Sequence, residues 1–398
     1  MGMWEGHAGG MDPNGDAEDG ASAHRGTRVT ESRSSVAALT DVETWKARKA
    51  YPSTLFAGGP VFGVARERPS GGWALLPHFT GLAPQDARDT LGAHFRALVG
   101  LAASGPGSDA ASGSGPDADR DRPALTAERV AEFTAAAERL DWEALDEMTV
   151  AGERYRVVRA ERFIRMGPDG PEPPRATDPE RTDPAEGPLD PAAGLVIDPD
   201  GDSGLSAGIL RVELLTALRK NGSVPRDVRE DSRAATRSHP GGVLLPATFM
   251  AAEREGGRWR PQSTGTAPTP RDARDGLAVQ LRVMVPWQKD LTDEEHELYK
   301  RAADRLDTEQ CDELDVAGRH FRVIRVERLI RIGSDGPEGP RPSDADPVPP
   351  AMVQERQPHE HGASADEDEG ESDERTRKFL ALFEEERQRR EHLHGERS

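Results

Sequence analysis

The chain has 398 residues and a formal net charge of −20, and 35% of its residues are hydrophobic. That length allows two or three domains, but the hydrophobic share is lower than in an ordinary globular chain, so we expect part of the chain to be disordered. The acidic balance excludes a general nucleic-acid coat and leaves room only for a local basic patch.

Membrane proteins and disulfide-rich proteins are also excluded. No apolar run approaches the roughly 20 residues that cross a bilayer, and the start MGMWEGHAGG has neither the basic residues nor the apolar core of a secretion signal. Cys311 is the single cysteine, so neither an intramolecular disulfide nor a cysteine-based zinc site can form. We therefore expect a soluble, cytoplasmic protein without a membrane partner.

Four segments rich in Gly, Pro, Ser, Asp and Glu are predicted to be unfolded, because they cannot bury enough apolar surface to offset the entropy of ordering. They are residues 1–31, 107–121, 170–194 and 362–374.

Two stretches of the chain are similar to each other. Residues 126–172 align without a gap with residues 292–338, and upstream Trp73 aligns with Trp259. This internal repeat predicts a disordered N-terminal tail at 1–35, a first repeat at 36–179, a linker and connecting helix at 180–222, a second repeat at 223–345, and an acidic linker with a short C-terminal helix at 346–398.

The first repeat is predicted to contain helices and strands. A helix at residues 41–52 is followed by strands at 61–68 and 71–79. Two helices come next, one after Pro84 and one at 130–140, and a hairpin at 146–164 ends the repeat. Thr40 and Glu43 have the spacing of a capping box at the first helix. The hairpin turns at an Ala-Gly pair, which suits a type II turn or a type I turn with a glycine bulge better than a type I′ turn.

The second repeat has the same predicted order, with Thr292 and Glu295 as a capping box. Between the repeats, residues 203–222 are expected to form an extra helix that stops at Asn221 and Gly222. The predicted fold class is α+β: an internally duplicated α-β-β-α-α-β-β unit, with antiparallel sheets, helices on one face, and disordered termini and linkers. We expect the repeats to pack face to face around a pseudo-twofold axis.

The last strand of each repeat carries an arginine at every third position. Residues 153–166 therefore have a net charge of +3, and residues 318–332 a net charge of +4. Side chains alternate between the two faces of a strand, so these arginines cannot form one flat basic stripe. Glu161 lies on one face between Arg159 and Arg165, and most of the arginines are expected to form structural ion pairs of this kind.

The opposite face is predicted to be the core side. It carries the candidate anion-binding residues Arg162, Arg328, Arg156 and Arg322. In apolar surroundings Arg162 and Arg328 must find a carboxylate or an anion. One interpretation is that a bulge turns them outward, or that Asp89 or Asp275 pairs with them. The other is that the repeats bring the two arginines together to hold an acidic ligand.

No stretch meets the requirements of a known catalytic or cofactor motif. The glycines after each arginine strand match neither a dinucleotide-binding loop nor a phosphate-binding loop. Asp198, Asp200 and Asp202 have calcium-loop spacing, but Ser203 and Ile209 stand where glycine and a bidentate glutamate are needed. The sequence predicts no cofactor, no metal and no catalytic residue, and favours a protein that is not an enzyme.

Four stretches, YPSTLFAGGPVFGVARE, GSVPRDV, SHPGGVLLPATF and RVVRAERFIRMGPDGPEPPR, resemble a family of actinobacterial proteins classed as a domain of unknown function. The resemblance covers roughly residues 36–345 and implies no activity and no site residues. The β-β-α order of residues 62–95 also resembles small antitoxin-like sheets that bind partner proteins or RNA.

Two functions remain. The favoured one is a non-enzymatic interaction or regulatory scaffold with protein partners, and the alternative is an anion, nucleotide or RNA binder that uses the arginine strands. Phe379, Leu382 and Phe383 lie on one face of a helix predicted over 376–392. Such a helix either docks in a partner's groove or caps this chain.

Overall fold

The structure is a computed structural model that describes residues 35–104, 126–180, 190–198, 204–219, 222–263, 265–289, 291–356 and 369–395. The disorder predicted for residues 1–35 and 107–121 lies outside these residues, apart from Ser35. So do residues 199–203, which include Asp200, Asp202 and Ser203 of the calcium-like loop.

The helices are α1 (Ser35–Ala50), α2 (Pro84–Ser104), α3 (Ala127–Trp142), α4 (Leu205–Thr216), α5 (Arg226–Ser238), α6 (Pro270–Val279), the π-helical turn η2 (Gln280–Met284), α7 (Val285–Gln288), α8 (Asp293–Glu309), α9 (Ala351–Arg356) and α10 (Glu369–Gly395). The strands are β1 (Ser53–Phe56), β2 (Val61–Glu67), β3 (Trp73–Leu75), β4 (Glu147–Val150), β5 (Glu153–Gly167), β6 (Gly170–Pro171), β7 (Val196–Ile197), β8 (Gly241–Glu255), β9 (Arg258–Pro261), β10 (Glu313–Val316), β11 (Arg319–Gly333) and β12 (Gly336–Pro337).

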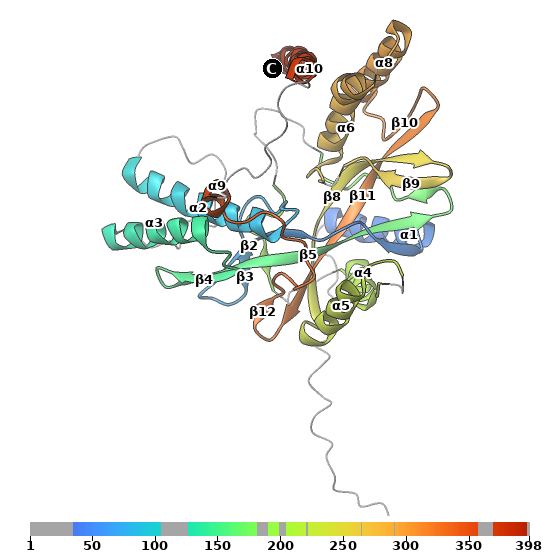
Figure 1. The fold of residues 1–398 in the computed structure, drawn as a ribbon. Helices are drawn as coiled ribbons and strands as arrows, with labels where there is room; N and C mark the ends of the chain where they lie inside the picture. Colours follow the sequence, from blue (N-terminus) through green and yellow to red (C-terminus); the bar gives the residue numbers. More distant parts are fainter. Residues whose placement is uncertain are drawn as a thin grey trace, which may run out of the picture.

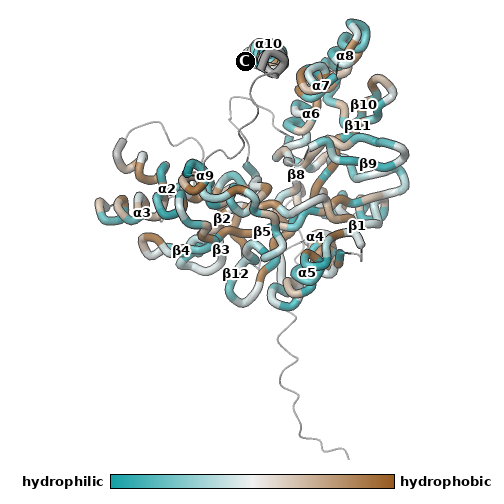
Figure 2. Tube along the Cα trace, viewed as in Figure 1, coloured by the Kyte–Doolittle hydropathy of each residue, from teal (hydrophilic) through white to brown (hydrophobic). Residues whose placement is uncertain are grey.

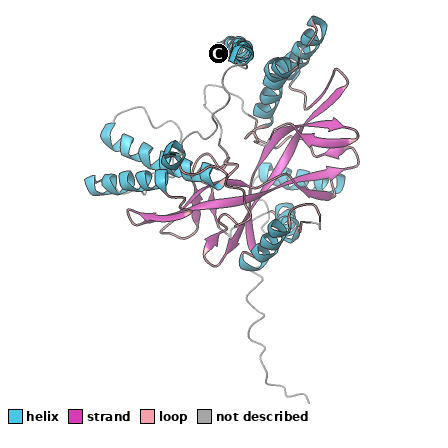
Figure 3. Cartoon of the chain, in the orientation of Figure 1, coloured by secondary structure: helices cyan, strands magenta, loops and turns pink. Residues whose placement is uncertain are grey.

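The strands form one curled antiparallel sheet with the helices around it (Figures 1 and 3). Its main path runs β7-β3-β2-β5-β11-β8-β9. The long strands β5 and β11 pair at the centre, where Arg162 lies opposite Arg328 and Glu161 lies opposite Leu329. The two halves therefore join edge to edge through β5 and β11, and the predicted face-to-face packing is wrong.

The fold is α+β, as predicted, and the element order of the first half recurs in the second. The series α3, β4, β5, β6 covers residues 127–171, and the series α8, β10, β11, β12 covers residues 293–337. The capping box of Thr292 and Glu295 at the start of α8 is confirmed. The internal duplication itself stays a prediction from the sequence.

Both faces of the central strands are buried. On one face, Tyr155 of β5 packs with α2 and α3, and Phe321 of β11 packs with α6 and α8. On the other face, Val158 and Ile324 belong to apolar clusters that, in the described ranges, contain no helical residue. Figure 2 shows apolar segments along β2 and β5. The helices cover one face as expected, but the core lies on both, because the curled sheet and the loop after β3 enclose the second.

The predictions at the ends of two helices are wrong. Helix α1 begins at Ser35, so Thr40 lies inside it, and its carbonyl accepts a hydrogen bond from Thr44 Oγ1. Helix α4 ends at Thr216, well before Gly222, because Ala217 leaves the helical conformation with a ψ of 128°.

The hairpin turn also differs from the prediction. Ala151 and Gly152 have φ values of +52° and +77°, and Ala317 and Gly318 have +48° and +73°. Two consecutive positive φ values define a type I′ turn, whose twist matches that of the flanking strands. In each hairpin an alanine therefore occupies the left-handed region, which costs roughly 1–2 kcal/mol.

Residues 170–180 are folded, although their composition predicts disorder. They begin with β6, and Glu172 is buried. Composition misleads here because Arg175 and Asp178 of this segment pair with Glu327 and Arg325 of the other half, and Arg175 also pairs with Glu172.

Candidate functional site

Arg162 and Arg328 lie side by side at the centre of the sheet, as the ligand-binding hypothesis requires. They are cross-strand partners in the β5–β11 ladder, and both are buried. Arg162 Nε donates to the carbonyl of Gly59 over 2.8 Å, and Arg328 Nε donates to the carbonyl of Pro246 over 3.1 Å.

The carboxylates proposed as their partners lie elsewhere. Asp89 is exposed and accepts a hydrogen bond from Gln85, and Asp275 lies 3.9 Å from Arg390. A register shift does occur between β8 and β11 at Val326 and Arg328, but it does not turn Arg328 outward. A bulge leaves backbone groups without ladder partners. Here the carbonyl of Pro246 accepts hydrogen bonds from Nε and Nη2 of Arg328.

Burial makes this pair of like charges unfavourable. The pKa of Arg328 is lowered to about 10, mainly by burial and in smaller part by the neighbouring Arg162, while Asp190 raises it. Burial also lowers the pKa of Arg162. The pair can hold backbone carbonyls in place, and its positive charge is the physical basis for the alternative of anion binding.

The other two candidates, Arg156 and Arg322, lie apart from this pair. Arg156 is six residues from Arg162 along β5, and Arg322 is six residues from Arg328 along β11, so each lies about 20 Å from the pair. Arg156 pairs with Glu147 at 2.7 Å and lies over the ring of Trp73. Arg322 pairs with Glu313 at 2.7 Å and lies over the ring of Trp259. The structure therefore brings together two of the four candidates and places the others in separate ion pairs.

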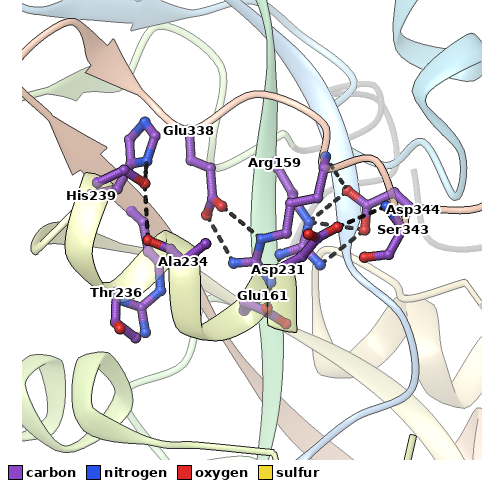
Figure 4. A network of polar contacts seen from close by, with 12 residues as sticks. Arg159, Glu161, Asp231, Ala234, Thr236, His239, Glu338, Ser343 and Asp344 are labelled. Carbon is purple, nitrogen blue, oxygen red and sulfur yellow. Dashed lines mark hydrogen bonds and ion pairs between the residues drawn. The ribbon is translucent and has the colours of Figure 1, made fainter. Parts of the chain in front are cut away.

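The opposite face of β5 carries a buried ionic network, which we call the Glu161 cluster (Figure 4). It comprises Arg159, Glu161, Arg219, Arg331, Glu338, Arg341 and Asp344, all less than a tenth exposed. Arg159 pairs with Asp344 at 2.8 Å, and Arg341 donates to Glu161 over 2.8 Å and to Glu338 over 2.6 Å. Arg219 donates to the second oxygen of Glu161 over 2.9 Å.

A corresponding network, the Glu327 cluster, lies on β11. It comprises Arg165, Glu172, Arg175, Asp178, Arg325 and Glu327. Arg325 pairs with Asp178 at 3.0 Å and with Glu327, and Arg175 lies 3.3 Å from Glu327. In both clusters, the strand of one half is bonded by the segment that follows the last strand of the other half. The two halves are thus clamped together by an exchange of charged segments.

The same exchange recurs at the start of two helices. Arg88 of α2 pairs with Asp346 at 2.5 Å, and Arg274 of α6 pairs with Glu180 at 2.6 Å. Each arginine also binds an acid of its own half, Asp146 or Asp312.

Electrostatics in the Glu161 cluster favour the charged form of its central carboxylate. Burial disfavours that form, but Arg159, Arg341 and Arg219 outweigh burial and hold the pKa of Glu161 at about 2. A buried carboxylate held by three guanidinium groups is a structural element, because a group with so low a pKa is a weak general base.

Sequence reasoning identified Glu161 and Glu327 but missed their partners Arg341, Asp344, Arg175 and Asp178. The available signal was that the similarity between the halves continues beyond the strands, through PEPPRATD and PEGPRPSD. Both runs place a glutamate, an arginine and an aspartate at equal spacing.

A cavity of about 990 Å³ lies beside the Glu161 cluster, between β1, the chain that follows α4, and residues 343–345. Its lining includes Arg159 and Arg219 of that cluster together with apolar residues such as Phe56 and Leu218. It lies on the helix-covered face, whereas Arg162 and Arg328 point to the other face.

Within the described ranges, no three His, Cys, Asp or Glu side chains are arranged to hold a metal ion. Nor does any helix in those ranges have the length and apolarity to span a bilayer. Cys311 is half-buried beside the apolar cluster of α6 and α8, and burial raises the pKa of its thiol. A protonated thiol among apolar neighbours is a small hydrophobic residue rather than a nucleophile.

No curated protein and no solved structure matches the chain. Its residues 34–113 and 116–347 match a family described as a family of unknown function, DUF5954. These residues include both arginine strands and most of the charged segments that clamp them. The chain therefore belongs to the DUF5954 family.

Proposed function

We propose that this protein is a non-enzymatic interaction scaffold that works in the cytoplasm, as the sequence predicts. The observation that carries the proposal is the docking of α10 on the second half. Phe379 of α10 contacts Trp287 of α7 with ring centroids 5.4 Å apart, and Phe383 stacks on Phe379 at 5.9 Å. The second half thus has a face that binds a helix.

Charged residues fix the position of this helix. Arg282 of η2 donates to Glu386 of α10 over 3.2 Å and to Asp304 of α8 over 2.7 Å. Arg389 of α10 donates to Asp307 over 2.7 Å. Glu386 is buried, so the contact combines an aromatic anchor with desolvated ion pairs, which is the usual composition of a specific interface.

The docked helix keeps apolar surface for a further contact. Leu380 is 57% exposed and Phe383 is 49% exposed, although both belong to a helix that is held in place. Exposed apolar residues next to an ordered contact are typical of protein-binding surfaces. We therefore propose that α10 and the face beneath it form one binding surface for a partner protein.

The arginine strands support this proposal over RNA binding. Most of their arginines bond carboxylates or carbonyls inside the protein, so few donors are left for phosphate groups. The anion, nucleotide or RNA binder remains the second proposal, and it rests on the adjacent positive charges of Arg162 and Arg328.

Photo-crosslinking in the native cell tests the scaffold. With a benzophenone side chain at position 383 of the full chain, we expect a discrete crosslink to another protein, which is lost when Leu380→Glu is added. The same group at Glu138, an exposed position on α3, is the control. Crosslinks confined to the chain itself, or equal at positions 383 and 138, would contradict the proposal.

A further inference from the structure

The cavity beside the Glu161 cluster has an apolar wall and a charged floor. Leu55, Phe56, Phe62 and Val224 line the wall. The charged lining residues are Arg159, Arg219, Asp344 and Glu213, of which Asp344 pairs with Arg159 and Glu213 pairs with Arg48. A volume of about 990 Å³ is at the upper end of the range for small-molecule sites. The cavity can thus take a ligand with a sizeable apolar body and a polar end.

Arg219 lines this cavity and has one donor without a hydrogen-bond partner among the described residues. Its side chain is 7% exposed and lies over the ring of Phe56, with Cζ 4.1 Å from the centroid. Nη2 donates to Glu161, but Nε is buried and has no hydrogen-bond partner among the described residues. A buried N–H without an acceptor is costly, so the Arg219 guanidinium is not fully satisfied inside the protein.

The charges of the two clusters differ by one. The Glu327 cluster has three arginines and three acids, Arg165, Arg175 and Arg325 with Glu172, Asp178 and Glu327. The Glu161 cluster has the corresponding six residues and Arg219 in addition, so four arginines face three acids. Arg219 thus carries the excess positive charge, and its Nε is one of the buried N–H groups without a hydrogen-bond partner in the described part of the chain.

We propose that the cavity binds an organic monoanion with an apolar body, whose carboxylate pairs with the Arg219 side chain and neutralises the excess charge. One excess charge matches a carboxylate better than a phosphate dianion. The apolar wall selects acids with an aliphatic or aromatic body over small polar acids.

Calorimetric titration of the full chain with three ligands of equal chain length tests this proposal. The ligands are decanoate, 1-decanol and decyl phosphate. We expect decanoate to bind about tenfold or more tightly than 1-decanol, because the carboxylate adds a charge-assisted hydrogen bond. Equal affinities for decanoate and decanol, or no binding of decanoate, would overturn the proposal, and tighter binding of decyl phosphate would overturn the choice of a monoanion.

Two variants locate the site. Arg219→Met should reduce the affinity for decanoate about tenfold, to that of decanol, and Arg66→Met is the matched control, since Arg66 pairs with Glu153 outside the cavity. Val224→Trp narrows the cavity and keeps every charge, so it should weaken binding of both ligands even if Arg219→Met fails to fold. Unchanged decanoate binding by Val224→Trp would place the site elsewhere.

Discussion

Replacing Glu161 with glutamine tests whether the buried clusters hold the two halves together. Glutamine keeps the volume and removes the negative charge, which leaves Arg159, Arg219 and Arg341 buried around a neutral group. Removing one partner of a buried ion pair costs about 3 to 5 kcal/mol. The pKa of Glu161 supports this magnitude, since its decrease from 4.5 to about 2 corresponds to about 3 kcal/mol.

The pH dependence makes this prediction specific. The pKa of Glu161 is lower in the folded protein than in the unfolded chain, so its contribution is complete above pH 4.5 and is lost as the pH falls towards 2. The free energy of unfolding of Glu161→Gln should therefore be about 3 kcal/mol below that of the wild type at pH 7. The difference should shrink towards zero near pH 2, where Glu161 is itself half protonated.

Urea unfolding followed by circular dichroism at several pH values measures this difference. Glu143→Gln is the control, because Glu143 forms an exposed pair with Arg139 one helical turn away, and it should cause no measurable loss. A loss for Glu161→Gln no larger than that of the control, or a loss that stays constant between pH 7 and pH 2, would refute the structural role of this carboxylate.

Three further predictions concern other parts of the molecule. Arg328→Met should lower the free energy of unfolding by roughly 1 to 3 kcal/mol, because the carbonyls of Pro246 and Phe79 lose their donors. If the pair with Arg162 is structural, wild type and variant will both lack salt-dependent heparin binding; binding that weakens in the variant would favour the anion binder. Ala151→Asn should raise the free energy of unfolding by roughly 1 kcal/mol in chemical denaturation, because asparagine tolerates a φ of +52° better than alanine, and no gain would count against strain at this turn. Deleting residues 357–398 should lower the melting temperature, because the aromatic contact of α10 and its ion pairs with the second half are lost, and an unchanged value would contradict the observed docking.

The local patterns of the sequence determined the order of the elements. Apolar spacing of 3.6 residues predicts α2 and α3, the residues at 292 and 295 predict the start of α8, and the arginine strands lie where alternation places them. These features depend on neighbours within a few positions, so the sequence alone contains the information. Even the sharing of one strand face by Glu161 and Arg159 follows from this alternation.

The tertiary structure alone decided which charges meet. Arg159 bonds Asp344 across 185 positions, and Arg325 bonds Asp178 across 147. The composition of 170–180 predicts disorder, yet the segment folds because Arg325 and Glu327 of β11 pair with its Asp178 and Arg175. The register of β5 and β11 places Arg162 beside Arg328, and the chain after α4 adds Arg219 to one cluster and not to the other. Such pairings depend on where distant segments cross in space, and no periodicity along the chain records that.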